Sequence, residues 1–285
     1  MIDIALRRRF FADEIAAVAN LRTPTLVDAL ASIPRERFLP QGPWQVTGEG
    51  AVAGAAARQT PDADPQHVYH NYAVAIDAER MLFNGAPGLV AGTIDALNLQ
   101  PGARVLHIGA GLGYYSALIG HVVGSAGRTL ALEIDRDLAA AARANVRPMP
   151  WVEVREADGR AVSEPFDAIL VNAGVTHPEE SWLDALVDGG RLILPLTATI
   201  QAMGAIGKGV MVLVTRAGEH EWTARVLTFV AIYSAAGLRD EALNAQLGAA
   251  LMQTPFPRLK RLRRDHHDRE QACWLHGPHF CLSVS

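Results

Sequence analysis

The stretch ARVLHIGAGLGYYSALIGHVVGSAGRTLALEID, residues 103–135, decides the fold. Its apolar run at residues 105–108 is typical of a buried parallel strand. A glycine loop at residues 109–113 follows directly and leads into an apolar helical pattern. A second strand is expected at residues 129–134, and it ends in acidic residues. The order strand, glycine loop, helix, strand, acid is typical of a nucleotide-binding α/β unit.

This arrangement predicts a site for the adenosine half of a cofactor. Glycines allow close approach of the backbone, and the start of the following helix supplies free N–H groups. Glu133 lies about 20 residues beyond the loop, where an acid can accept hydrogen bonds from ribose hydroxyls. The residues that we expect to line the cofactor at this point are Gly109, Ala110, Gly111, Gly113, Tyr114, Glu133 and Ile134.

The loop also indicates which cofactor binds. Dinucleotide-binding proteins carry G-x-G-x-x-G, whereas this loop reads G-x-G-x-G and is followed by Tyr114 and Tyr115. The pattern favours S-adenosylmethionine over NAD, and NAD remains the alternative. The two tyrosines either stack over the cofactor or only begin the helix.

Composition narrows the class of protein. The chain has 285 residues, of which 49% are hydrophobic and 20% charged, which is typical of a well-packed globular protein. A net charge of −4 gives no general reason to expect nucleic-acid binding. The two cysteines, Cys273 and Cys281, do not indicate a disulfide scaffold. No secretory signal or membrane-spanning run is evident, so we expect a cytoplasmic protein without membrane partners.

The remaining pattern predicts a doubly wound, mostly parallel α/β sheet with an antiparallel edge hairpin. Further buried strands are expected at residues 151–154, 166–172 and 191–196, and an antiparallel pair at residues 209–215 and 222–233. Helices are expected at residues 1–22, 25–31, 88–99, 138–146 and 179–187.

Three segments are expected along the chain. Residues 1–80 form a helical and irregular cap, in which residues 41–66 have little periodicity and resemble a long binding loop. Residues 81–236 form the cofactor-binding core. Residues 237–285 form a C-terminal extension with a short helix, a basic run and a terminal hairpin.

At this point the chain resembles class I S-adenosylmethionine-dependent methyltransferases, and most of all the protein-L-isoaspartate O-methyltransferase family. The resemblance extends over roughly residues 25–233. The residues that carry it are ALASIPRERFLP (29–40), VLHIGAGLGYYSALI (105–119), ALEID (131–135), EADGR (156–160), FDAILVNAG (166–174) and LVDGGRLILPL (186–196).

The resemblance implies roles for individual residues. The glycine loop would line the methionine and ribose of the cofactor, and Glu133 would bind the ribose hydroxyls. Asp158 and Gly159 would contact the adenine edge. Asn172 and Ala173 would lie beside the sulfonium.

One departure from the family concerns the reaction centre. The family carries a serine near the reacting methyl group, two residues before a proline, and this chain has Gly85 there, in FNGAP (83–87). Asn84 either supplies a replacement polar contact or only forms a turn with Gly85. The substitution leaves cofactor binding untouched, but it puts isoaspartate in doubt as the methyl acceptor.

A carboxylate acceptor is ionised at pH 7 and needs no general base. A hydroxyl or amine acceptor would need one, and the nearest candidates are His70, His107 and His177. We expect His107, inside the first strand, to be a packed core histidine. His177 follows the fourth strand, at the edge where ligands bind.

The tail contains two further patterns. The run Arg258, Lys260, Arg261, Arg263 and Arg264 is interpreted as a solvated face, and docking of an acidic peptide or nucleic acid is the alternative. The residues His266, His267, Cys273, His276, His279 and Cys281 could ligate metal, but their spacing matches no common zinc pattern. A structural hairpin without metal is therefore predicted.

The leading hypothesis is an enzyme that methylates a carboxylate of a protein or peptide, either an isoaspartyl residue or an aspartate in a precursor peptide. The alternatives are methylation of a small-molecule oxygen or nitrogen, and a binding module that has kept the cofactor site without transfer activity.

Overall fold

The computed structural model describes residues 3–48, 57–199 and 205–285. Its internal contacts divide the chain into two compact units. Unit 1 comprises Met1–Ala103 and Ala110–Glu156, and unit 2 comprises Arg104–Gly109 and Ala157–Ser285. The division passes through the glycine loop, directly after Gly109. The three segments predicted from sequence are continuous stretches of chain, whereas each unit combines two stretches. The predicted segments therefore stay a prediction.

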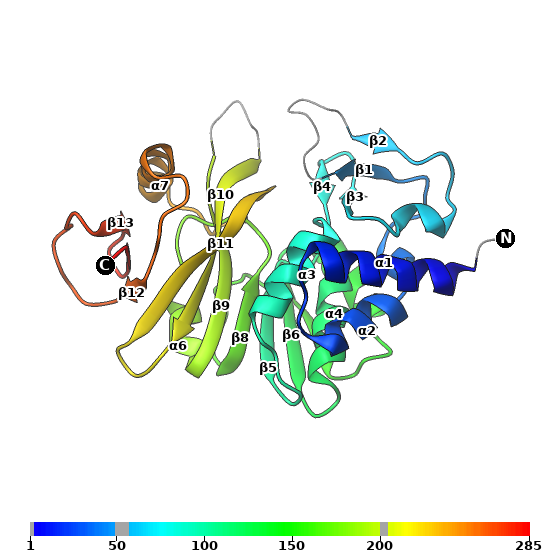
Figure 1. Cartoon of the computed structure of the whole chain (residues 1–285), viewed down its shortest axis with the longest axis horizontal. Coiled ribbons are helices and arrows are strands. Elements are labelled where there is room, and N and C mark those ends of the chain that lie inside the picture. Colours follow the sequence, from blue (N-terminus) through cyan, green and yellow to red (C-terminus); the bar gives the residue numbers. More distant parts are fainter. Residues whose placement is uncertain (1–2, 49–56, 200–204) are drawn as a thin grey trace. The chain divides into compact units, whose positions relative to one another are not determined.

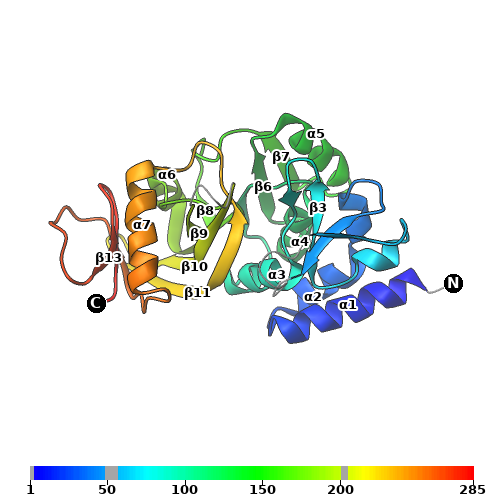
Figure 2. The same ribbon diagram turned by 90° about the horizontal axis from the view of Figure 1, so that it is seen from above.

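Unit 1 carries the N-terminal helices. Asp3 caps α1 by accepting a hydrogen bond from the backbone N–H of Ala5, and Pro24 occupies the first turn of α2, where its missing N–H costs nothing. Helices α1 and α2 pack side by side (Figure 2). The predicted helices are confirmed in this unit, as α1 (Ile4–Val18), α2 (Pro24–Ser32), α3 (Pro87–Ala96), α4 (Tyr114–Val123) and α5 (Arg136–Asn145).

A small antiparallel sheet in unit 1 corrects the expectation of an irregular segment at residues 41–66. Its strands lie in the order β2 (Arg58–Gln59), β1 (Gln45–Gly48), β3 (Tyr72–Asp77) and β4 (Leu82–Phe83). Strands of two and four residues are too short to show alternation in the sequence, and β1 forms by pairing with β3. Residues 49–56 of the expected loop lie outside the described residues.

Unit 1 also contains the parallel pair β6 (Arg128–Glu133) and β7 (Val152–Glu156). The register places Thr129 beside Val152 and Glu133 beside Glu156. Every residue of β6 from Thr129 to Glu133 is buried, as expected for a strand covered on both faces. The carboxyl end of β6 therefore brings Glu133 to the edge of the pair.

Unit 2 is built on a sheet whose strand order is β13-β14-β12-β11-β10-β9-β8-β5. The parallel strands are β5 (Arg104–Ile108), β8 (Phe166–Val171) and β9 (Leu186–Ala198). Strand β9 begins where the sequence predicted the end of a helix, because α6 (Glu180–Ala185) already stops at Ala185. Parallel core strands confirm the predicted α/β fold class.

Antiparallel strands extend this sheet further than predicted. The pair β10 (Ile206–Arg216) and β11 (Trp222–Tyr233) is antiparallel, as expected, but β11 is not the edge strand. The strands β12 (Arg261–Arg263), β14 (Cys281–Ser283) and β13 (Cys273–His276) continue beyond it (Figure 1). The expected tail helix is α7 (Glu241–Gln253), which lies against β13 (Figure 2).

None of the helices in the described part of the chain is long and apolar enough to cross a membrane.

Candidate active site

The glycine loop has the backbone conformation that its sequence predicts. Gly109, Gly111 and Gly113 have φ angles of +80°, +55° and +89°, in the left-handed region that favours glycine. A Cβ atom on Gly111 would lie 3.2 Å from Cδ1 of Ile76, so both the space and the backbone angle select glycine there. The N–H of Ala110 donates to the carbonyl of Leu132, 3.1 Å away, which holds the loop at the end of β6.

Glu133 meets the glycine loop at this point. Its Oε2 accepts a hydrogen bond from the N–H of Gly111 at 2.8 Å, and its Oε1 accepts one from the N–H of Asp135 at 3.1 Å. The side chain is buried. Gly111 of the loop and Glu133 at the end of β6, which are 22 residues apart in sequence, are therefore hydrogen-bonded in unit 1, as the nucleotide-binding prediction requires. The neighbouring Ile134 is exposed.

The environment of Glu133 affects its ionisation in two ways. On balance the pKa of the carboxyl lies above its ordinary value, because burial outweighs the backbone N–H donors from Asp135, Gly111 and Ile134, which lower it. These donors favour the charged form, which accepts hydrogen bonds most strongly. A buried carboxylate held by backbone donors still has lone pairs for additional hydroxyl donors.

The two tyrosines after the loop pack inside unit 1. The ring of Tyr114 lies 5.6 Å from that of Phe38 and 5.2 Å from that of Tyr115. The hydroxyl of Tyr115 donates to the carbonyl of Gly85 at 3.0 Å. Both side chains are buried, and burial raises the pKa of Tyr114, which keeps its hydroxyl neutral. A role for Tyr114 in cofactor binding stays a prediction.

The segment that departs from the family pattern is also in unit 1. Asn84 accepts a hydrogen bond at Oδ1 from the N–H of Val74 in β3, at 3.0 Å, and its own N–H donates to the carbonyl of Val74. Its Nδ2 is buried without a hydrogen-bond partner among the described residues. Gly85 has a φ of +79°, and a Cβ there would lie 3.1 Å from Cγ2 of Val90. Asn84 thus anchors a strand, and Gly85 has a backbone suited to glycine.

The remaining predicted cofactor residues lie in unit 2. Asp158 accepts hydrogen bonds from Arg160, whose side chain holds the pKa of this carboxyl below its usual range. The carbonyl of Gly159 accepts a hydrogen bond from Nε1 of Trp182 at 2.8 Å. A Cβ on Gly159 would lie 2.7 Å from Cγ2 of Ile108, so this position has no room for a side chain.

Asn172 and Ala173 follow β8 directly, and both are half-buried. The N–H of Asn172 donates to the carbonyl of Ile108 at 2.8 Å. Sequence reasoning missed the residue that fixes the next part of this loop, Arg239. Its guanidinium donates to the carbonyl of Gly174 at 3.0 Å and to that of Thr197 at 2.6 Å. A single arginine between a strand and a helix carries no signal in the sequence.

The three candidate histidines lie in different surroundings. His107 is fully buried, and burial lowers its pKa to about 4, which confirms a packed and neutral core histidine. Nδ1 of His177 lies 2.8 Å from Oγ1 of Thr176, and its Nε2 lies 3.4 Å from Glu179. His70 is exposed and stacks on Tyr72.

The basic run of the tail divides into two groups. Arg258, Lys260 and Arg261 are exposed, as predicted for a solvated face. The other two are half-buried and paired with acids, Arg263 with Asp265 at 2.6 Å and Arg264 with Asp184 at 2.8 Å.

Comparison with known proteins agrees with this geometry. The profile of the family Protein-L-isoaspartate(D-aspartate) O-methyltransferase (PCMT) matches residues 55–220. Protein-L-isoaspartate O-methyltransferase 1 of Rhodopseudomonas palustris (strain HaA2) is 32% identical over 197 residues, which are 68% of this chain and 70% of the relative. The protein-L-isoaspartate O-methyltransferase of Methylorubrum populi is 31% identical over 225 residues, or 78% and 90% of the two chains.

Solved structures show the same fold. One protein-L-isoaspartate O-methyltransferase matches with a TM-score of 0.62 at 21% identity, over 88% of this chain and 73% of its own. A Plasmodium falciparum structure, described as a beta-aspartate methyltransferase (PCMT) in complex with S-adenosyl-L-homocysteine, matches with a TM-score of 0.60 at 16% identity, over 80% and 97% of the two chains. The chain therefore belongs to the protein-L-isoaspartate O-methyltransferase family, whose members use S-adenosyl-L-methionine to methylate isoaspartyl carboxylates in proteins.

Proposed function

We propose that this chain binds S-adenosylmethionine through the glycine loop and Glu133 and methylates a side-chain carboxylate of a protein or peptide. The observation that carries the proposal is the pair of hydrogen bonds that join Glu133 to the N–H groups of Gly111 and Asp135. These bonds place a buried carboxylate directly against a loop of left-handed glycines. The family match supports the reaction type.

The residues present fit this cofactor. Glu133 would accept hydrogen bonds from the ribose hydroxyls, and the loop N–H groups and the start of α4 would receive the carboxylate of the methionine part. The adenine contacts of Asp158 and Gly159 and the sulfonium contacts of Asn172 and Ala173, which lie in unit 2, stay predictions from the sequence. When bound, S-adenosylmethionine supplies an electrophilic methyl group. The protein's own tasks are to hold the acceptor and to exclude water.

A carboxylate acceptor suits the side chains of the described residues. It is already ionised at neutral pH, so the protein needs to orient it and has no proton to remove. Both ring nitrogens of His177 already have neighbours, Thr176 and Glu179, and burial favours the neutral form of His107. Of the three candidate bases, only His70 is exposed without such a contact or burial, so the chain offers few groups to an acceptor that needs a general base.

Gly85 bears on which carboxylate is used. The family serine would meet an unfavourable φ here, and its Cβ would come within 3.1 Å of Val90. The backbone at this position therefore suits glycine better than the family serine. Asn84 keeps one buried donor, Nδ2, without a partner among the described residues, and we propose that this donor contacts the acceptor. An aspartyl residue in a peptide is then the second acceptor to test beside isoaspartate.

The proposed partners are polypeptides, in keeping with the family, and neither nucleic acid nor membrane. The net charge of −4 supports the first exclusion, because a nucleic-acid-binding surface is usually strongly basic. The cytoplasmic location stays a prediction from the sequence.

The experiment is methyl transfer from radiolabelled S-adenosylmethionine to matched peptides that differ only in carrying isoaspartate, aspartate or asparagine at one position. We expect label on the isoaspartyl or aspartyl peptide, released as methanol by mild base, and none on the asparaginyl control. Label that survives base would exclude a methyl ester. Transfer to none of the three peptides, with cofactor binding intact, would contradict the proposed reaction.

A further inference from the structure

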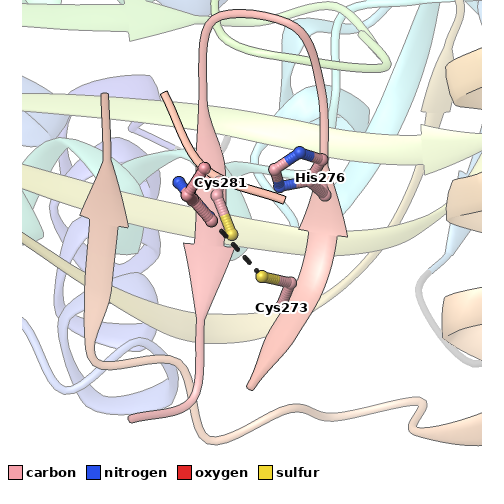
Figure 3. A group of neighbouring side chains, drawn as sticks. Cys273, His276 and Cys281 are labelled. Carbon is pink, nitrogen blue, oxygen red and sulfur yellow. Dashed lines mark hydrogen bonds between the residues drawn. The ribbon is translucent and has the colours of Figure 1, made fainter. Parts of the chain in front are cut away.

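Four metal-ligating side chains of the tail lie together in unit 2. They are His267, between β12 and β13, Cys273 and His276 on β13, and Cys281 on β14. One ligand atom from each residue lies within 4.8 Å of all the others. Figure 3 shows the two sulfur atoms facing one another across the hairpin, with the His276 ring beside them. The other two histidines of the tail pattern, His266 and His279, do not belong to the group.

The distances are close to those of a four-coordinate metal site. Zinc–sulfur and zinc–nitrogen bonds of about 2.3 and 2.0–2.1 Å place the ligand atoms of a tetrahedron roughly 3.3–3.8 Å apart. Sγ of Cys273 lies 3.6 Å from Nε2 of His267. The strand register pairs His276 directly with Cys281, so both project from one place in the hairpin. Small rotations of the side chains would bring the other atoms to the same spacing.

Hydrogen bonds already orient two of the four ligands. Nδ1 of His267 lies 2.9 Å from the carbonyl oxygen of Asp265, and because a carbonyl only accepts, Nδ1 carries the proton. In the neutral ring, Nε2, which already contacts Sγ of Cys273, then carries the lone pair that a metal ion would take up. The N–H of Glu270 donates to Sγ of Cys273 at 3.3 Å. Such partners around the ligands are typical of protein metal sites.

A third observation is a buried polar atom without a partner. Nδ1 of His276 is inaccessible to solvent and makes no hydrogen bond to any described residue. An unpaired buried nitrogen costs free energy unless a ligand or water satisfies it. Ligation of a metal ion would give the buried nitrogen of the His276 ring a polar partner.

We propose that His267, Cys273, His276 and Cys281 bind one zinc ion. Two thiolates and two imidazoles are a ligand set that zinc prefers, and four protein ligands leave no open position for catalysis. On binding, each cysteine thiol releases its proton to solvent, and two thiolates, two neutral histidines and Zn²⁺ make a site of zero net charge. The site is structural.

The role of the ion follows from the strands that it joins. Strands β12, β13 and β14 have only three, four and three residues, and hairpins this short are marginal on their own. The ligands come from both strands of the β13–β14 hairpin and from the segment that connects it to β12. Zinc would fix this end of the unit 2 sheet. All four ligands lie beyond residues 55–220, which the family profile matches.

A disulfide between Cys273 and Cys281 is the competing use of the same atoms. Both cysteines are free thiols in the structure. A disulfide would leave His267 and His276 without a function in the cluster. The experiment therefore needs to measure both metal and thiols.

The test uses the full chain, purified without chelator. We expect one zinc per chain by elemental analysis, and after exchange with cobalt(II) the absorption bands of a tetrahedral, thiolate-ligated ion. Cys281→Ser should weaken zinc binding by more than about 100-fold, because even removal of a group that only supports a ligand costs 10- to 100-fold. His279→Gln is the matched control, since His279 is an exposed histidine in the same hairpin.

Several outcomes would overturn the proposal. The first is a fully reduced wild-type chain that takes up neither zinc nor cobalt, and the second is zinc binding that is equal in Cys281→Ser and wild type. A Cys273–Cys281 disulfide in freshly purified protein that binds no metal after reduction would assign the sulfurs to redox chemistry instead. If Cys281→Ser does not fold, the wild-type cobalt spectrum and zinc content still decide. All these readouts are independent of methyl transfer.

Discussion

The glycine loop with Glu133 and the four-residue cluster of the tail are two proposed binding sites that are built in opposite ways. In the loop, the groups that would face the ligand are backbone N–H donors without side chains in front of them, and one of these donors fixes the carboxylate of Glu133. In the tail, the proposed ligating atoms belong to the side chains of His267, Cys273, His276 and Cys281, and the backbone only brings them together. The first kind of site is visible in consecutive residues. The second depends on the pairing of strands.

The largest expected effect separates the two sites. Glu133→Ala removes the carboxylate that would accept both ribose hydroxyls, and hydrogen bonds to a charged group contribute about 1.5–3 kcal/mol each, so cofactor affinity should fall by more than about 100-fold. Calorimetry with S-adenosylhomocysteine measures it, and the zinc content of the tail should not change. Glu153→Ala is the control, because Glu153 lies on the neighbouring strand β7 and pairs only with arginines, Arg128 and Arg155, in the described part of the chain. Unchanged affinity in Glu133→Ala would refute the assignment of the cofactor site.

His107, in the strand before the glycine loop, contrasts with the histidines of the tail cluster. Burial alone keeps it neutral. Its pKa is lowered from 6.5 to about 4 by burial. Between these values the unfolded chain binds a proton that the folded chain does not, so stability is present above pH 6.5 and is lost as the pH falls toward 4. The loss should be about 3 kcal/mol. Denaturant unfolding of wild type and His107→Asn at a series of pH values measures it. If the unfolding free energy depends on pH equally in both proteins, His107 is not the group whose pKa is lowered by burial.

A smaller effect, on stability, is expected at Gly159, where the packing leaves no room for a side chain. Gly159→Ala would place its Cβ 2.7 Å from Cγ2 of Ile108, and overpacking of this kind costs about 1–3 kcal/mol of unfolding free energy. Gly218→Ala, whose Cβ would lie 3.9 Å from Glu221, is the control and should change stability little. Thermal unfolding of both variants makes the comparison. No difference between them would show that the loop around Gly159 relaxes freely.

The smallest structural effect, but the most informative for the substrate, comes from Gly85→Ser. The φ of +79° is unfavourable for any L side chain, and we expect a loss of about 1 kcal/mol or more in stability. Gly85→Ala has the same backbone cost without the hydroxyl. If the missing hydroxyl limits isoaspartate methylation, Gly85→Ser alone should gain activity on the isoaspartyl peptide relative to the aspartyl one. Equal behaviour of the two variants would show that the hydroxyl is not the deciding group.

Helices and strands that are long or strongly patterned were predictable from the sequence. The strands and strand ends that were not predicted have local causes. Strand β8 matches its apolar run almost to the residue, because burial on both faces requires an unbroken apolar sequence. Strands β1 and β2 were missed because two to four residues carry no period. The start of β9 was missed because Leu186 continues the pattern of the preceding helix until pairing with Phe166 draws it into the sheet.

The sequence by itself determined the cofactor-binding unit, because a strand, a glycine loop, a helix and an acid act through local backbone geometry that consecutive residues encode. It also located the departure at Gly85. Only the tertiary structure decided that Asn84 is tied to β3, that Arg239 holds the loop after β8, and that four tail residues share one centre. Those arrangements depend on contacts between residues distant in the chain, whose spacing in the sequence is set by the length of intervening loops and carries no chemical signal.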